Sequence, residues 1–286
     1  MSNDANYGRF GSGHAVRRIE DPALVRGAGR FADDVTLDGQ THLVFLRSPY
    51  AHAKIVSIDA SAALEMPGVL AVITGADLVA AGVRPLPVSA GFPRPDGSPG
   101  ASPPRHPLAH EVARFAGEAV AAIVAETRDQ ARDARDAVFV EYEDLPSVVD
   151  LRDATAEGAP KVWPPIPDNF AAGMRHGDAA KAEAAFAAAA HVVRLELENQ
   201  RLAPSPMETR GVLASYDAAT DRIDIRLSSQ MPTAVRNTIA DEVLGIPKEK
   251  IRVTVGDVGG GFGMKTGVYP EDAVLAWASR SLKRPV

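Results

Sequence analysis

Short hydrophobic runs alternate with turn-forming segments over the first half of the chain. Five of these runs have the β-branched and apolar content of strands: His42–Arg47, Lys54–Asp59, Val69–Thr74, Ala119–Ala125 and Val138–Tyr142. Ala60–Met66 and Thr127–Ala137 predict helices, and Thr127 can cap the second of them. The stretch Arg84–Arg105 is rich in Pro, Gly and Ser and indicates a long surface loop. The pattern predicts one α+β domain over residues 15–146.

The second half begins with a Pro-rich stretch of little periodicity, which predicts a connector over residues 147–177. Its expected helices are Asp178–Ala189, Thr233–Leu244 and Pro270–Leu282. Its expected strands are His191–Glu198, Gly211–Tyr216, Arg222–Leu227 and Ile251–Val255. Gly245 is placed to end the middle helix in a left-handed conformation. We expect a second domain over 178–286, and the last residues, Lys283–Val286, suggest an incomplete fold.

Composition excludes several classes of function. The 286 residues carry a net charge of −6 with acidic and basic residues interspersed, so no basic stripe favours nucleic acid. The chain has no cysteine, so it offers no thiolate ligand or nucleophile. No apolar run approaches the roughly 20 residues of a membrane span. The polar start, Met1–Gly13, does not resemble a secretion signal, and we expect a cytoplasmic protein.

One local motif stands out: the glycine-rich stretch Val255–Lys265, in which four glycines surround Phe262 directly after a predicted strand. Glycines let a backbone approach a ligand closely, and successive N–H groups can converge on an anion or oxo group. The spacing fits neither a dinucleotide fingerprint nor a phosphate-binding P-loop. Glu271 and Asp272 in the next helix would also repel a phosphate there. A simple tight turn between strand and helix remains an alternative explanation of the glycines. A nucleotide-binding domain is another, and it would require this chain alone to bind NAD or ATP tightly.

The stretch Gly259-Gly260-Gly261-Phe262-Gly263-Met264-Lys265 resembles a loop of the xanthine dehydrogenase/aldehyde oxidase/carbon monoxide dehydrogenase large-subunit family. Ser48–Ile55, Pro67–Val69, Thr74–Leu78, Gly117–Ala121 and Val140–Pro146 are similar to that family's a/b hammerhead domain. Gln200-Arg201, Pro206–Gly211 and Ser228-Ser229-Gln230 resemble the opening of its first molybdenum-cofactor-binding domain. The resemblance implies a hammerhead domain followed by an incomplete cofactor-binding domain.

The resemblance also implies site residues. It places the Gln230 amide and Phe262 beside molybdenum, with Gly259, Gly260, Gly261 and Gly263 allowing close approach to a molybdenum-pterin cofactor, expected in its cytosine dinucleotide form. From the residues alone, Gln230 could instead be a strand-end glutamine bonded to backbone, and Phe262 a core side chain. Thr266 stands where xanthine dehydrogenases have a substrate-orienting Glu, which disfavours xanthine.

Two functions follow as alternatives. The chain could be part of a large subunit that oxidises an aldehyde, N-heteroaromatic or similar small substrate with water as the oxygen source. Its partners would be a second chain completing the site, an iron–sulfur subunit and an FAD subunit. No catalytic residue is assigned in this chain, because the family's general base is expected beyond residue 286. Alternatively, the chain is a truncated or degenerate fragment that acts only in assembly.

Metal-binding and hydrolase sites find little support in the sequence. His106 and His110 are four residues apart, but Pro107 makes a metal-binding helical pair improbable. No Ser–His–Asp order or Gly-x-Ser-x-Gly elbow supports a hydrolase.

Overall fold

A computed structural model describes residues 18–88 and 90–286. The expectation for Met1–Gly13 and the first residues of the 15–146 domain therefore lie outside the described residues. In these ranges the helices are α1 (Asp21–Leu24), η1 (Ala32–Asp34), α2 (Ser61–Leu64), α3 (Gly75–Ala80), α4 (Arg128–Ala137), α5 (Ala179–Ala188), α6 (Pro232–Asn237), η2 (Thr238–Leu244), η3 (Lys248–Lys250) and α7 (Pro270–Leu282). The strands are β1 (His42–Arg47), β2 (Ala53–Asp59), β3 (Val69–Thr74), β4 (Val112–Ala113), β5 (Ala119–Ala125), β6 (Phe139–Asp144), β7 (Val212–Asp217), β8 (Arg222–Leu227) and β9 (Ile251–Thr254).

The first half contains two antiparallel three-stranded sheets, ordered β1-β5-β3 and β4-β2-β6. Strand β5 is central and every one of its residues is buried. Ile123 packs with Ala134 of α4, whereas Ala122 and Val124 belong to the cluster that contains α7, so alternate side chains point to opposite faces. Helices on both faces explain why β5 is a continuous apolar run. Thr127 caps α4 as predicted, accepting the Gln130 N–H at 3.2 Å.

The second half is built on the sheet β7-β8-β9, in which β7 and β8 form a hairpin and β9 runs parallel to β8. The helix predicted over Thr233–Leu244 is present as α6 followed by the π-helical η2. At its C-terminal end, Arg84 donates to the carbonyls of Asp241 and Val243 from its side chain and backbone, which satisfies groups that have no partner within the helix. Gly245 ends the helix in the predicted left-handed conformation, with φ of 62°.

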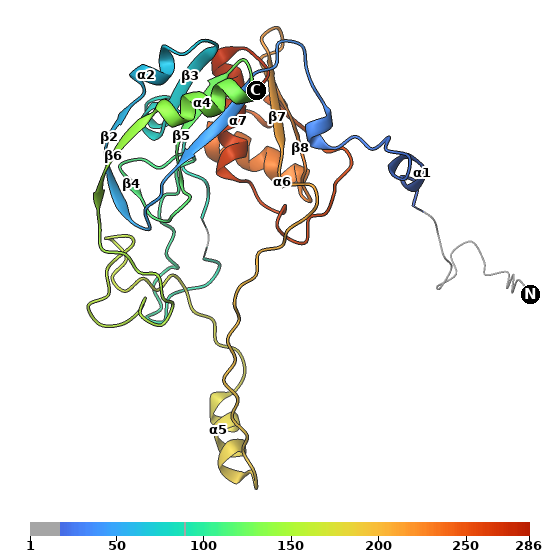
Figure 1. Cartoon of the computed structure of the whole chain (residues 1–286). Helices are drawn as coiled ribbons and strands as arrows, with labels where there is room; N and C mark the ends of the chain where they lie inside the picture. The colour runs from blue at the N-terminus through green and yellow to red at the C-terminus, as the bar shows by residue number, and fades with distance from the viewer. Residues whose placement is uncertain (1–17, 89) are drawn as a thin grey trace, which may run out of the picture.

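Helix α7 lies between the two halves and joins their cores (Figure 1). Its buried residues Ala273, Val274 and Leu275 form one hydrophobic cluster with Ile73 of β3 and Leu78 of α3. Both α3 and β4 were missed in the sequence, since six and two residues are too short for a recognisable period. The two halves therefore share packing.

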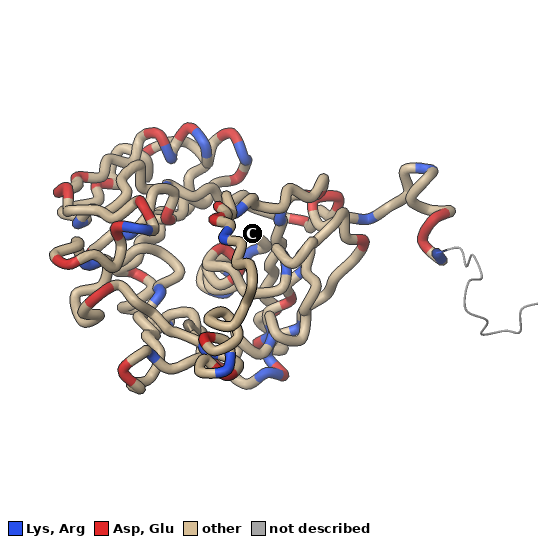
Figure 2. The backbone as a smooth tube through the Cα atoms, turned by 90° about the horizontal axis from the view of Figure 1, so that it is seen from below, with Lys and Arg blue, Asp and Glu red and all other residues tan. Residues whose placement is uncertain are grey.

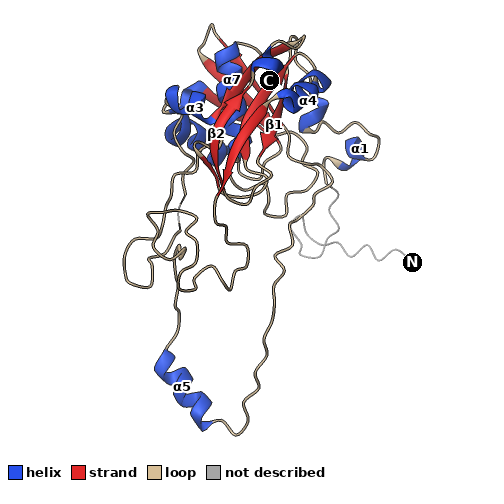
Figure 3. Cartoon of the chain, turned by 60° about the vertical axis from the view of Figure 1, so that its left-hand side comes forward, coloured by secondary structure: helices blue, strands red, loops and turns tan. Residues whose placement is uncertain are grey.

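One predicted strand is wrong. Residues 191–198 have no regular secondary structure, although the neighbouring helix α5 forms close to its predicted position. Figures 1 and 3 show α5 and its flanking segments extending away from the rest of the molecule. A strand needs a hydrogen-bonded neighbour, and none of the described sheets reaches this segment. The sequence has the alternating pattern of a strand, but the described residues include no neighbouring strand to pair with it.

Candidate functional site

The glycine-rich loop joins β9 to α7 and lies against two segments that flank the β7–β8 hairpin. A Cβ atom at Gly259 would lie 2.4 Å from Cβ of Glu208, and one at Gly261 would lie 2.4 Å from Oε1 of Gln230. Any larger residue at either position would clash. Protein contacts thus disfavour a larger residue at both positions, and at Gly261 the Gln230 side chain would have to move to admit one.

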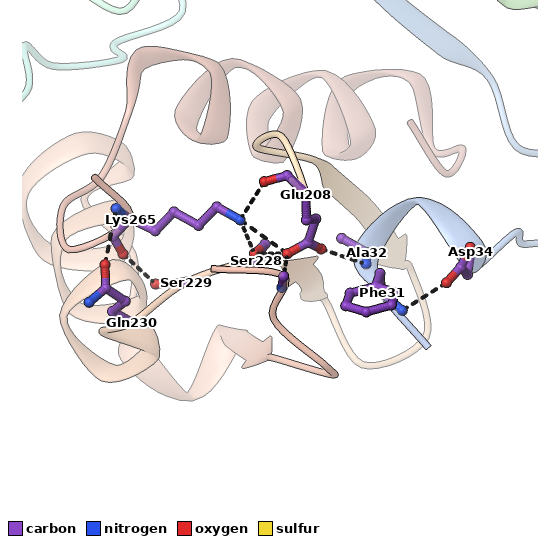
Figure 4. A network of polar contacts seen from close by, with 9 residues as sticks. Phe31, Ala32, Asp34, Glu208, Ser228, Ser229, Gln230 and Lys265 are labelled. Atoms are coloured by element: carbon purple, nitrogen blue, oxygen red, sulfur yellow. Dashed lines mark hydrogen bonds and ion pairs between the residues drawn. The ribbon is translucent and has the colours of Figure 1, made fainter. Parts of the chain in front are cut away.

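Beneath the loop, Lys265 forms a buried ion pair with Glu208 (Figure 4). The Lys265 side chain is fully buried, and its Nζ donates to Glu208 Oε2 at 3.0 Å, the Glu208 carbonyl at 2.9 Å and Ser228 Oγ at 2.8 Å. Three acceptors satisfy all three ammonium donors. The pair links the loop to the segment before β7, and Ser228 links it to the end of β8.

The Glu208 carboxylate is held in its charged form. Burial by itself would raise its pKa, but hydrogen bonds from Ser228 Oγ at 2.6 Å, from the Gly259 N–H at 2.8 Å and from Lys265 together lower the pKa below its usual value. The backbone N–H of Ala32 adds a fourth donor at 3.3 Å. A network of this kind fixes the loop in one conformation.

Gln230 follows β8 and faces the loop through its amide oxygen. Oε1 accepts the N–H groups of Gly263 at 3.1 Å and Lys265 at 3.3 Å. Because only the oxygen of an amide can accept these protons, the NH₂ group must be the end that points elsewhere. Gln230 is therefore bonded to backbone, as in the alternative role, and no hydrogen bond of its NH₂ group is found among the residues that the structure describes.

Phe262 is 73% exposed and has φ of 48°, so it does not fill the core, and that alternative was wrong. Left-handed conformation is uncommon outside glycine and is kept only where neighbours enforce it. Its ring lies over Gly260, where a Cβ atom would come within 2.7 Å of the ring. The loop thus presents an aromatic side chain at the surface.

The loop also presents backbone donors. Within residues 18–88 and 90–286, no hydrogen bond is found for the N–H groups of Gly260, Gly261 and Phe262. Together with the Gln230 NH₂ group, they form a set of donors on neighbouring residues. Such a set suits an oxo group or anion, so the residues present fit the molybdenum-pterin cofactor that the motif implies.

The start of α7 is occupied by protein contacts. Glu271 accepts Arg47 Nη2 at 2.7 Å and Arg210 Nη1 at 3.4 Å, which lowers its pKa although burial alone would raise it. Asp272 accepts the Tyr269 N–H at 2.9 Å, and burial raises its pKa to about 6. Both carboxylates at the helix start are thus engaged by other groups of the protein.

The remaining sequence candidates are His106 and His110. The His106 and His110 rings lie 5.6 Å apart, and among the described residues no group of three or more potential ligands could hold a metal ion. Acidic and basic residues are interspersed along the described chain (Figure 2). No helix in the described ranges is long and apolar enough to cross a membrane.

Sequence reasoning included Glu208, Ser228 and Lys265 in the family motifs but predicted no role for them. Their shared network could not be read from the chain, because Glu208 and Lys265 are 57 residues apart. The local signal for Lys265 was a lysine at the end of a glycine-rich stretch that contains one other charged residue, Asp257.

Comparisons with known proteins agree with this architecture. Residues 26–146 match the aldehyde oxidase and xanthine dehydrogenase a/b hammerhead domain, and residues 162–286 match the molybdopterin cofactor-binding domain. The chain is 40% identical over 96% of its length to the nicotine 6-hydroxylase large subunit of Paenarthrobacter nicotinovorans. It is 36% identical over 93% of its length to the carbon monoxide dehydrogenase large chain of Hydrogenophaga pseudoflava.

Solved structures give the same result. Quinoline 2-oxidoreductase from Pseudomonas putida 86 matches 95% of the chain with a TM-score of 0.85 and 38% identity. The chain spans about a third of these proteins: 32% and 33% of the two sequences and 33% of the solved chain. Over that third it belongs to the xanthine dehydrogenase/aldehyde oxidase/carbon monoxide dehydrogenase family of molybdenum-cofactor large subunits.

Proposed function

We propose that this chain supplies the hammerhead domain and the first cofactor-facing loop of a molybdenum-pterin hydroxylase. The enzyme would oxidise a small substrate with water as the oxygen source. The observation that carries the proposal is the orientation of Gln230, whose oxygen is held by the N–H groups of Gly263 and Lys265. That leaves an amide donor beside a loop with free backbone donors, which is what an oxo-bearing cofactor needs.

The residues would act by position. When bound, the molybdenum-pterin group supplies the redox chemistry. The Gln230 NH₂ group would donate to it, and the Gly260, Gly261 and Phe262 N–H groups would face it. The Phe262 ring would wall the adjoining pocket, while Gly259 lets the backbone approach Glu208 and Gly263, with φ of 81°, lets the backbone turn. The buried pair of Lys265 and Glu208 would keep these donors in place and would not touch the cofactor.

The substrate proposed is an N-heteroaromatic compound or an aldehyde. Nicotine 6-hydroxylase and quinoline 2-oxidoreductase are named for N-heteroaromatic substrates, and an aldehyde oxidoreductase from Desulfovibrio gigas also shares the fold, with a TM-score of 0.79 at 26% identity. Thr266 donates its hydroxyl to the Gly263 carbonyl at 2.9 Å, so it braces the loop. Because the Thr266 hydroxyl is uncharged and already hydrogen-bonded, it does not provide the charged contact expected for xanthine.

Several finer features are proposed from the resemblance of the motifs. They are the cytosine dinucleotide form of the cofactor, an iron–sulfur subunit, an FAD subunit, and a polypeptide that supplies the rest of the site, including the general base. A cytoplasmic location is proposed as well, and the absence of cysteine is compatible with it. The domain boundaries 15–146, 147–177 and 178–286 also stand as proposals.

The test is affinity purification of the tagged chain from its native host, with molybdenum and pterin assayed in the product. We expect molybdenum and pterin to co-purify with the wild-type chain and with the control variant Gln40→Ala. Gln230→Ala should lower molybdenum retention by about tenfold, the usual cost of losing a group that supports a metal centre. A wild-type chain that carries neither molybdenum nor pterin would contradict the proposal and favour a non-catalytic fragment.

A further inference from the structure

A long segment of the chain has no protein around it. Every residue from 174 to 205 is exposed, and we call this segment the arm. It contains α5 and then a stretch without regular structure, and it extends well beyond the sheets (Figure 3). Large apolar side chains in the arm are uncovered, with Val193 at 91%, Leu195 at 78% and Leu197 at 80% exposure. Exposed apolar side chains grouped in this way mark an interaction surface.

The order of residues in the arm is that of a strand with two unlike faces. Val193, Leu195 and Leu197 alternate with Arg194, Glu196 and Glu198. In an extended backbone, alternate side chains point to opposite sides, so the apolar residues would share one face and the charged residues the other. This pattern is typical of a strand with one face on a core and the other in water.

The backbone of this stretch is also unpaired. No backbone hydrogen bond connects residues 191–198 to any other part of the described chain. A strand pattern with unpaired backbone groups and uncovered apolar side chains lacks both a neighbouring strand and a core. Both needs are met by the same kind of partner, a β-sheet with an open edge and an apolar face.

The comparisons indicate which polypeptide that is. Quinoline 2-oxidoreductase shares the fold over 95% of this chain, too large a share to omit the whole arm, yet the matched part is only 33% of the solved chain. Large subunits with this fold therefore contain twice as much further polypeptide. That remainder is the polypeptide that accompanies this fold in a solved protein, and it is the occupant to which we assign the arm.

We propose that residues 193–198 form a β-strand in a sheet supplied by the polypeptide that corresponds to the remaining two thirds of these large subunits, here called the completing polypeptide. The apolar face of Val193, Leu195 and Leu197 lies on its core, and the charged face stays in solvent. The inference rests on the proposed function only for the identity of this partner. A second copy of the chain is the competing occupant.

The experiment co-expresses this chain with the completing polypeptide from the same organism and compares amide hydrogen exchange of the chain alone and in the complex. Residues 193–198 should exchange rapidly alone and at least about 100-fold more slowly in the complex, as amides in paired strands do. Equal exchange in both samples overturns the proposal. So does the absence of a complex.

Variants separate the two faces of the strand. Leu195→Asp together with Leu197→Asp should weaken the complex by at least about 100-fold, because two buried leucines become charged. The matched control, Glu196→Ser with Glu198→Ser, alters the opposite face and should change the affinity by less than about threefold. All four positions are exposed in the chain itself, so its own fold is unaffected. Equal effects of the two pairs would overturn the assigned face.

Two further measurements complete the test. If the chain alone forms a dimer that Leu195→Asp with Leu197→Asp dissociates, and the completing polypeptide does not compete, the occupant is a second copy and the proposal fails. Molybdenum is assayed in the same complexes. A protected arm without molybdenum contradicts the proposed function and leaves this inference standing, whereas molybdenum with an unprotected arm contradicts only this inference.

Discussion

Replacing Lys265 by Met keeps most of the side chain's volume and removes its charge and its three hydrogen bonds. Glu208 would remain with donors from Ser228, Gly259 and Ala32 but without its cation. Lys265 is fully buried and the Glu208 side chain is only 12% exposed, so solvent screens the pair weakly. We expect the free energy of unfolding to fall by about 3 kcal/mol, the lower range for breaking a buried pair.

The loss should depend on pH. The lowered pKa of folded Glu208 means that the carboxylate contributes stability above its unfolded pKa of about 4.3, and that this contribution is lost as the pH falls through the folded pKa. Lys265→Met removes one cause of the lowered pKa. The stability difference between wild type and variant should therefore be largest near pH 7 and shrink below about pH 4.

Urea unfolding followed by circular dichroism at pH 7 and pH 4 measures both effects. Lys250→Met is a suitable control, because the Lys250 side chain is partly exposed and its contacts with Thr220 and Asp221 lie at the surface, where such a pair is worth at most about 1 kcal/mol. A double-mutant cycle with Glu208→Gln should give a coupling of roughly 1–3 kcal/mol. If Lys265→Met lies within about 0.5 kcal/mol of wild type at pH 7, the network does not hold the loop as argued.

Three other changes test separate parts of the structure. Gly261→Ala should displace Gln230, 2.4 Å from the new Cβ, and destabilise the chain by roughly 1–3 kcal/mol, whereas Gly267→Ala, with open space around it, should be nearly silent in the same denaturation assay. The raised pKa of the Asp272 carboxyl makes the wild-type chain lose stability as the pH rises from about 4 to 6, and Asp272→Asn should remove this loss. The variant should then be more stable than wild type at pH 8, by at most about 3 kcal/mol, and an unchanged dependence of stability on pH would contradict this prediction. Val274→Ala should lower stability by roughly 2 kcal/mol and leave a single unfolding transition; two separate transitions would show that the halves do not share a core.

Local features of the fold could be predicted because their causes lie within a few residues. Thr127 caps α4, Gly245 ends η2, and Ala119–Ala125 forms the buried strand β5, each from its own short pattern. The glycine-rich loop was predicted for the same reason, since its chemistry is written in consecutive residues. The contacts of Arg84 with the end of η2 were not, because Arg84 and Asp241 are 157 residues apart.

The sequence by itself determined the family, most of the paired strands and longer helices, and the residues of the candidate loop. Only the tertiary structure decided that Glu208, Ser228 and Lys265 form one buried network, that Gln230 turns its oxygen toward the loop, and that α7 joins both halves in one core. The physical reason is the range of the interactions. Caps and turns close over three or four residues, whereas ion pairs and strand pairing join positions far apart, so an alternating pattern such as Val193–Glu198 predicts a strand but not the partner that completes it.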